Sequence, residues 1–185
     1  MERTTHVLDA KSLKALAHPI RVQLLGLLRQ DGPSTATALG ARLGESSGTT
    51  SYHLRQLAEV NLVTEDETRG NARERWWRAA QDSTELRGED WVDDPDVKPA
   101  LDAYMSAILA SYASRAQAFL DEADSWPKKW QRVSEMSDYM LSLTAAEAAR
   151  LTEAVHELLR SYQREPRKGD SPMVFQFQAF PRRPQ

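Results

Sequence analysis

The amino-acid sequence predicts a mainly helical protein with a small β part, an α+β fold. Apolar residues recur at three- and four-residue steps over most of the chain, which is the spacing of one face of a helix. Two short runs rich in strand-forming residues flank the Gly-Asn pair at residues 70–71, as in a β-hairpin. The composition, 41% hydrophobic and 28% charged over 185 residues, is typical of a globular protein.

The first third of the chain begins with two predicted helices. Apolar residues over 9–30 follow a helical period that Pro19 interrupts. Proline fits the first turn of a helix, so we expect one helix over residues 10–17 and a second over 19–30.

Two shorter helices are predicted next. Ser34 or Thr35 caps the first of them, and Gly44 ends it. The second begins after Ser46 and runs to Glu59. Two short helices joined by a tight glycine-containing turn form a helix-turn-helix pattern.

Two strands are expected to follow, at 62–67 and 73–79, with Gly70 and Asn71 supplying the positive backbone angles of the hairpin loop. A hairpin directly after the second helix of such a motif is a wing. Trp76 and Trp77 are adjacent, so on a strand they point to opposite faces.

The sequence predicts four segments. A winged helix-turn-helix domain spans 1–80, an acidic linker spans 81–96, and a long helix with one wide apolar stripe spans 97–124. A small α+β unit spans 125–185.

The last unit is predicted to be β-α-β. Residues 133–143 are expected to be extended, and the Thr144-Ala-Ala-Glu147 capping box opens a helix that runs to Tyr162. Residues 173–180 alternate between apolar and polar side chains, as a half-buried strand does.

The charge is unevenly distributed along the chain. The formal net charge is −3, from 24 Lys and Arg against 27 Asp and Glu. Residues 1–80 hold 11 basic and 9 acidic side chains, whereas residues 81–185 hold 13 and 18. Seven of those acids lie within 82–96. Because partners respond to local charge, the acidic total does not exclude nucleic acid as a partner of the first segment.

The predicted second helix of the motif carries side chains suited to double-stranded DNA. Short hydroxyl groups near a helix N-terminus and longer side chains one or two turns on can reach base edges and phosphates in the major groove. We expect Thr49, Thr50 and His53 to face base edges. The side chains expected to hold phosphates are Ser47, Ser51, Arg55 and, on the wing, Arg69.

The wing supplies further candidates for contact with phosphate or the minor groove. Asn71 and Arg73 accompany Arg69 there. Glu65 and Glu67 lie close by in the sequence, so a merely solvated hairpin remains an alternative.

These features resemble the ArsR-type family of winged helix-turn-helix regulators over residues 9–80. The resemblance rests on Leu-Ala-His-Pro-Ile-Arg-Val-Gln-Leu-Leu at 16–25 and on Thr-Ser-Tyr-His-Leu-Arg-Gln-Leu at 50–57, followed by Leu62-Val63. It implies a cytoplasmic, homodimeric transcriptional regulator, most often a repressor that a ligand releases from a palindromic operator.

The sequence departs from the metal sensors of that family. Their cysteine ligands have no counterpart here because the chain has no cysteine, and residues 34–43 contain no ligand type. Asp102 on the long helix has no histidine partner, and the four histidines show no metal-ligand spacing. We therefore expect no metal, with ligands pooled between two protomers as the alternative. We also expect no cofactor and, in the absence of a catalytic motif, no enzymatic activity.

The long helix is expected to form a homodimer, because two half-sites on DNA require a two-fold axis. Trp126 and Trp130 are candidates for lining an apolar ligand pocket, although a plain structural role for them is the alternative. The dimerisation residues are expected to be Leu101, Tyr104, Met105, Ile108, Tyr112 and Phe119.

Two other functions stay open at this stage. The winged fold and the acidic linker could bind protein and not DNA, or the chain could bind DNA without any effector. Residues 125–185 either support the dimer or bind an effector. No apolar run approaches the ~20 residues of a membrane span, and the charged N-terminal segment does not resemble a signal peptide. Together with the lack of cysteine, this predicts a cytoplasmic protein.

Overall fold

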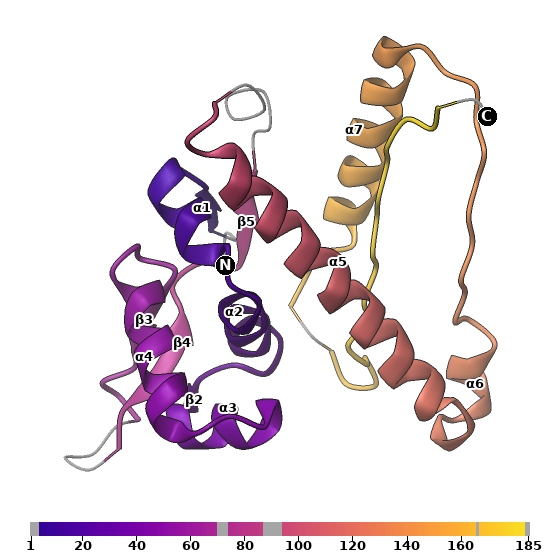
Figure 1. The fold of residues 1–185 in the computed structure, drawn as a ribbon. Helices are drawn as coiled ribbons and strands as arrows, with labels where there is room; N and C mark the ends of the chain where they lie inside the picture. The colour runs from indigo at the N-terminus through magenta and orange to yellow at the C-terminus, as the bar shows by residue number, and fades with distance from the viewer. Residues whose placement is uncertain (1–3, 70–73, 87–93, 166, 184–185) are drawn as a thin grey trace. The chain divides into compact units, whose positions relative to one another are not determined.

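The computed structural model describes residues 4–69, 74–86, 94–165 and 167–183. The chain divides into two compact units, 1–122 and 123–185. In chain order the N-terminal unit contains β1 (Thr5–Val7), α1 (Ala10–Leu16), α2 (Pro19–Asp31), β2 (Ser34–Thr35), α3 (Ala36–Leu43), α4 (Ser47–Ala58), β3 (Val63–Glu65), β4 (Trp76–Ala79), β5 (Ser83–Glu85) and α5 (Lys98–Asp121) (Figure 1).

The first two helices begin at local sequence signals, of which Pro19 was predicted and the Asp9–Ser12 capping box was not. The Asp9 carboxylate accepts a hydrogen bond from the Ser12 backbone N–H at 2.7 Å, and the Asp9 backbone N–H donates to the Ser12 hydroxyl at 2.9 Å. This capping box satisfies two amide groups at the start of α1. Pro19 occupies the first turn of α2, where a missing N–H costs no helical hydrogen bond.

The helix-turn-helix is formed by α3 and α4. Thr35 caps α3 by accepting from the Ala38 N–H at 3.2 Å, and Gly44 ends it in the left-handed conformation, with φ of 70°. Ser46 then caps α4 by accepting from the Thr49 N–H at 3.0 Å. The two helices cross closely at Gly40, where a Cβ atom would lie 2.8 Å from the Glu45 carbonyl oxygen.

The predicted hairpin is confirmed and gains a third strand. β4 pairs antiparallel with β3, placing Thr64 opposite Arg78, and antiparallel with β2, placing Thr35 opposite Trp76. The strand order is β2-β4-β3. Trp77 is buried whereas its neighbour Trp76 is half-buried, as expected from alternation along a strand.

Part of the predicted linker is a strand, which corrects the expectation of an uninterrupted spacer over 81–96. β5 pairs in parallel with β1, with His6 opposite Thr84. The pairing was missed because each strand is only three residues long and the partners lie far apart in the sequence. Of the remaining linker, residues 87–93 lie outside the described residues.

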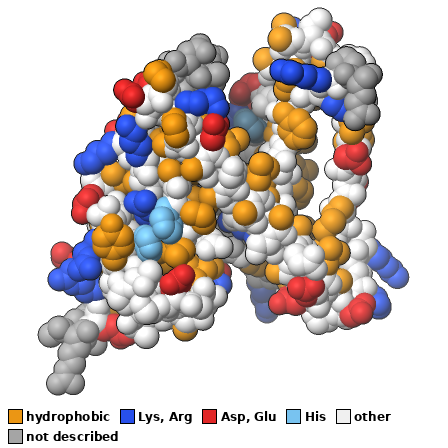
Figure 2. All heavy atoms as spheres, viewed as in Figure 1, with side chains coloured by type: hydrophobic (Ala, Val, Ile, Leu, Met, Phe, Trp, Pro, Cys, Tyr) orange, Lys and Arg blue, Asp and Glu red, His pale blue; other side chains and the backbone are white. Residues whose placement is uncertain are grey.

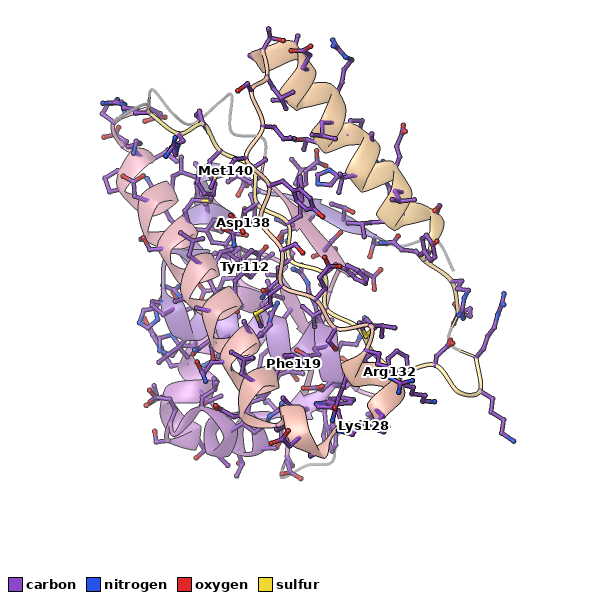
Figure 3. The ribbon with its side chains drawn as sticks, turned by 90° about the vertical axis from the view of Figure 1, so that its right-hand side faces the viewer. Tyr112, Phe119, Lys128, Arg132, Asp138 and Met140 are labelled. Carbon is purple, nitrogen blue, oxygen red and sulfur yellow. The ribbon has the colours of Figure 1, made fainter. Side chains whose placement is uncertain are left out.

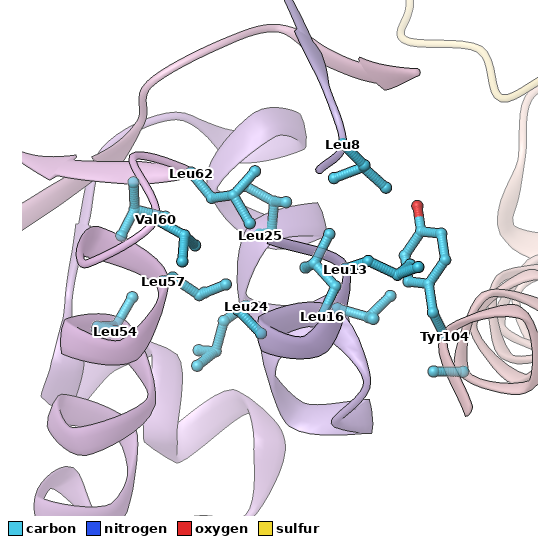
Figure 4. Close-up of a cluster of buried hydrophobic side chains, with 14 of the residues drawn as sticks. Leu8, Leu13, Leu16, Leu24, Leu25, Leu54, Leu57, Val60, Leu62 and Tyr104 are labelled. Carbon is cyan, nitrogen blue, oxygen red and sulfur yellow. The ribbon is translucent and has the colours of Figure 1, made fainter. Parts of the chain in front are cut away.

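The N-terminal unit has one hydrophobic core. Leucines from α1, α2 and α4 meet side chains from the loop before β3, as Figure 4 shows, and Leu13, Leu24, Leu54, Leu57 and Leu62 are completely buried. α5 joins this core through Leu101, Tyr104 and Ala107. The core therefore holds α4 by its inner face only, which leaves the other face outward.

The C-terminal unit contains the 3-10 turn η2 (Ala123–Ser125), α6 (Lys128–Gln131) and α7 (Ala145–Ser161). The predicted capping box of α7 is confirmed, since Thr144 and Glu147 bond to each other's backbone N–H groups. The predicted β-α-β unit is wrong in its strands, because residues 133–143 and 173–180 form no β-ladder. Alternation can mark a strand, but a ladder also needs a partner strand.

Candidate nucleic-acid interface

The N-terminal end of α4 is polar and solvent-facing. Ser47 and Gly48 are exposed, and Thr49 is half-buried with its hydroxyl 2.8 Å from that of Ser46. The first turn of the helix has no acidic residue. Backbone N–H groups at such an end carry partial positive charge, so this end of α4 is suited to an anion such as a phosphate.

The outward side of α4 continues along the helix with larger side chains. Ser51 is half-buried, Arg55 is exposed, and Tyr52 is 54% exposed. Tyr52 was missed in the sequence analysis. The 3.6-residue period could have found it, because Tyr52 lies one turn after Gly48 and one turn before Gln56 on the side away from Leu54.

Two residues predicted to face base edges lie inside the domain, and this corrects their assignment. Thr50 is completely buried and its hydroxyl donates to the Ser46 carbonyl oxygen at 3.0 Å. His53 is only 7% exposed. Both share the inner face of α4 with Leu54 and Leu57, at helical spacings of three and four residues. A hydroxyl that bonds to its own helix can be buried at little cost, so polarity alone was a poor guide at Thr50.

His53 packs against His18, the N-cap of α2. Their ring centroids are 4.4 Å apart, and the Tyr52 ring lies 5.2 Å from that of His53 in an edge-on arrangement. Among the described residues, Nδ1 of neither imidazole has a hydrogen-bond partner. Burial, followed by the nearby His18 and Arg21, lowers the pKa of His53, whereas Glu45 opposes the shift. The lowered pKa favours the neutral imidazole of His53 on the inner face of α4.

The wing places one predicted arginine beside an aromatic ring. The Arg69 side chain is 57% exposed, its guanidinium lies 5.9 Å from the Trp76 ring centroid, and its Nε lies 3.6 Å from the Asp66 carboxylate. Asp66 also accepts from the Thr68 hydroxyl at 2.6 Å, and this bond is the main cause of its lowered pKa. These contacts orient Arg69 beside Asp66 and Trp76. The predicted contacts Asn71 and Arg73 lie outside the described residues.

Carboxylates interrupt the basic character of the wing. Glu65 is exposed and accepts from Arg75 at 2.9 Å, and Glu67 is exposed beside it. Both glutamates line an open groove of about 680 Å³ between the end of α4 and the sheet. Trp77 and Arg78 form another part of its wall. This groove is a poor place for a phosphate, because two carboxylates would repel it.

The long helix α5 has two different apolar faces. Leu101, Tyr104, Ala107 and Ser111 are buried, since α5 packs on α1 and α2. Leu101 and Tyr104 therefore belong to the core of their own chain, which corrects their assignment to a dimer interface. The wide apolar stripe that the sequence predicts for this helix therefore contains residues of both faces.

Of the remaining predicted dimerisation residues, Ile108 is packed against that core and the others are not part of it. Met105 is 44% exposed, and Leu109, which was not among the predicted contacts, is 49% exposed. Ile108, Tyr112 and Phe119 are half-buried. The outer face of α5 is thus the part that a second copy could contact.

The tryptophans proposed for a ligand pocket lie in the C-terminal unit, Trp126 directly after η2 and Trp130 within α6. Both are half-buried, and the Gln131 amide donates to the Trp126 carbonyl oxygen at 2.8 Å. The Lys129 ammonium lies 5.5 Å from the Trp130 ring centroid. A ligand role for Trp126 and Trp130 stays a prediction.

Two further properties of the described residues bear on the site. No three or more His, Cys, Asp or Glu side chains are grouped so that they could hold a metal ion. None of the described helices is long and apolar enough to cross a membrane.

Comparison with known proteins supports the helix-turn-helix assignment. Residues 16–66 match a family model described as a helix-turn-helix domain, which covers α2 through β3. The chain therefore contains a helix-turn-helix domain. No curated protein matches the chain.

Solved structures similar to this chain include two of a double mutant of ZitR from Lactococcus lactis. One is 12% identical with a TM-score of 0.33 over 79% of this chain and 75% of that chain. The other, in an apo form, is 14% identical with a TM-score of 0.34 over 80% and 84%.

Proposed function

We propose that the chain is a sequence-specific DNA-binding transcriptional regulator that acts as a homodimeric repressor on a palindromic operator. The observation that carries this proposal is the outward side of α4. It has a serine-capped N-terminus without acids, followed by hydroxyl groups, Tyr52 and Arg55 at positions that the core leaves uncovered. These are the donor types that major-groove and phosphate recognition need.

The structure changes which residues we assign to each role. Thr49 and Tyr52 take the place of Thr50 and His53 as candidates for base contact, because the latter two side chains are buried. Ser47, Ser51 and Arg55 are assigned to phosphates on the same helix. The remaining phosphate candidate is Arg69 on the wing.

A homodimer follows from the same proposal. A two-fold axis would set two copies of α4 about one helical turn of DNA apart, roughly 34 Å. The outer face of α5, with Met105 and Leu109, is the surface that we assign to this contact. We further propose that a small non-metal ligand releases the dimer from its operator.

The test is selection of bound DNA from a random pool, followed by titration of the selected site at several salt concentrations. Arg55→Ala should weaken binding to all sequences similarly and reduce the slope of log affinity against log salt by about 1. Arg160→Ala removes the same charge from the C-terminal unit and serves as the control. Thr49→Ala should cost roughly 1–3 kcal/mol on the selected site only.

A second candidate function is a protein-interaction module, favoured by the groove that Glu65 and Glu67 line. The same titration separates the two functions. If the intact dimer shows no salt-dependent affinity for any DNA in the pool, the DNA-binding proposal fails and the protein-interaction alternative gains.

A further inference from the structure

The C-terminal unit has ordered local structure without a core. Among its described residues, none is buried. Fourteen large hydrophobic side chains of this unit are exposed, and Tyr139, Met140, Tyr162 and Phe180 are each 78% exposed. Figure 2 shows hydrophobic side chains gathered on its surface. Folded chains do not normally leave this many large apolar side chains exposed without a partner for them.

The unit is nevertheless not a random tail. α7 begins at a complete capping box, and the turn after it is closed by Arg164, which donates to both Asp170 oxygens at 2.6 and 3.0 Å. This ion pair lowers the pKa of Asp170 to about 2. The returning segment then passes α7, where the Phe177 ring lies 6.0 Å from that of His156. One helix and one extended segment are therefore already held side by side.

This arrangement forms a single layer. Folded domains need at least two layers, because an apolar helix face or strand face has to be covered by another element. The exposed face of α7 includes Leu151 and Leu158, seven residues apart on the same side of the helix. The extended segment 173–180 presents Phe175 and has no strand partner among the described residues. The missing second layer must cover both elements.

We propose that the second layer is the same unit of a second copy of this chain, packed about the two-fold axis of the dimer. The inference rests on the homodimer proposed above and assigns to its C-terminal unit a part in the interface. The exposed apolar surface per copy is on the order of 1,000 Å², which meets the ~800 Å² that each partner buries in a standard interface.

Charge also favours a second copy over a charged partner. Residues 123–185 contain ten Lys and Arg against eight Asp and Glu, so the unit selects neither a polyanion nor a strongly basic partner. Two-fold packing needs a self-complementary surface, and an apolar, nearly neutral face is one.

In the sequence, an exposed apolar side chain at the end of α5 also leads directly into the unit. Leu120, 51% exposed, lies in the last turn of that helix, directly before the unit begins. Tyr112 and Phe119 lie on α5, and Met140 lies on the extended segment that follows α6 (Figure 3). In a dimer formed through the outer face of α5, the two C-terminal units follow that helix directly in the sequence.

The test uses the full-length protein with a photo-crosslinking phenylalanine derivative in place of Phe175. Copies labelled with ¹⁵N and unlabelled copies are unfolded and refolded together, irradiated, and digested for mass spectrometry. We expect crosslinked peptide pairs from residues 123–185 that join a labelled to an unlabelled copy in statistical proportion. The same derivative at Glu157, which is exposed but lies outside the Leu151–Leu158 face of α7, should give few such pairs.

A second variant keeps the test independent of the crosslinker. Leu151→Ser with Leu158→Ser should abolish the mixed-label pairs and the concentration-dependent hydrogen-exchange protection of α7. Glu157→Ser should change neither. Because the hydrophobic core of the N-terminal unit contains none of the described residues of 123–185, loss of the partner should open this unit without unfolding the N-terminal unit.

The outcomes separate this inference from the proposed function. Sedimentation velocity gives the mass of the same samples. A dimer that binds DNA but yields only same-label pairs, or none, overturns the inference and leaves the proposed function standing. A monomer at every concentration overturns both the inference and the proposed dimer, and binding to a single half-site then reports separately on DNA recognition.

Discussion

Helices in both units of the molecule begin at the same kind of local signal, but they differ in how far they are buried. α1 and α7 both begin at a capping box, formed by Asp9 with Ser12 and by Thr144 with Glu147. α1 contributes Leu13 and Leu16 to a closed core, whereas α7 has no buried residue. The comparison teaches that capping and helical period determine where a helix forms, and that burial depends on whether other elements return to cover it.

The largest expected difference in stability between the two units comes from a cavity in the N-terminal core. Leu57 is completely buried on α4, so Leu57→Ala should lower the free energy of unfolding by about 2–5 kcal/mol. Leu158→Ala, on the exposed face of α7, should change the unfolding of the N-terminal unit by less than about 0.5 kcal/mol. Urea titrations of both variants measure the difference, and equal losses would contradict the division into two independent units.

A smaller effect is expected at the crossing of α3 and α4. A Cβ atom on Gly40 would lie 2.8 Å from the Glu45 carbonyl oxygen and 2.9 Å from the Thr50 hydroxyl, neither of which can move freely. Gly40→Ala should therefore cost about 1–3 kcal/mol through overpacking.

Gly48→Ala is the matched control for this crossing. Its nearest neighbour would be the Ser46 hydroxyl at 3.7 Å, so alanine should be neutral or stabilise α4 by up to about 1 kcal/mol. Thermal unfolding compares the two variants, and destabilisation by both to the same extent would show that the close crossing is not the cause.

Removal of a helix cap is expected to cost about 1 kcal/mol of stability, so the two capping boxes provide a further test of the comparison. Asp9→Ala removes the acceptor for the Ser12 N–H and should lower the global stability of the N-terminal unit by about that amount, because α1 is part of its core. Thr144→Ala should instead lower only the local helicity and amide protection of α7. Hydrogen exchange resolves the two, and a global effect of Thr144→Ala would mean that α7 unfolds together with the N-terminal unit.

The smallest expected effect is a pH dependence at the inner face of α4. Burial, together with His18 and Arg21, lowers the pKa of His53 below its unfolded value of 6.5. The unfolded chain then binds more protons, so the stability of the N-terminal unit should fall as the pH decreases from 6.5 toward the lowered pKa, and level off below it.

His53→Gln cannot be protonated and should remove this part of the pH dependence, measured as thermal midpoints between pH 8 and pH 5. His156→Gln, in the C-terminal unit, is the control. An unchanged pH profile in the His53 variant would show that the histidine pair does not contribute to it.

Most of the N-terminal fold could be predicted because its signals are local. Pro19, Gly44 and Ser46 mark helix ends through backbone geometry and hydrogen bonds to their immediate neighbours. The β1–β5 pair could not be predicted in this way, since three-residue strands that lie far apart in the sequence carry little periodic signal.

The sequence predicted where the helix of the candidate interface lies, but not which of its side chains face outward. α4 was expected in the right place, yet Thr50 and His53 were assigned to its outer side because they are polar. Their burial depends on contacts beyond the local pattern, a hydrogen bond to the Ser46 carbonyl and packing against His18. Tyr52 was missed because an aromatic ring is more commonly buried. Which aromatic side chains stay outside the core depends on how the core packs.

By itself the sequence determined the helices, their caps, the wing hairpin and the separation of a mildly basic first segment from an acidic remainder. These follow from interactions within a few residues. Only the tertiary structure decided that Leu101 and Tyr104 close the core of their own chain, that His53 is hidden, and that the C-terminal unit has no second layer. Those outcomes depend on which distant surfaces meet, and burial depends on the whole set of neighbours rather than on any local pattern.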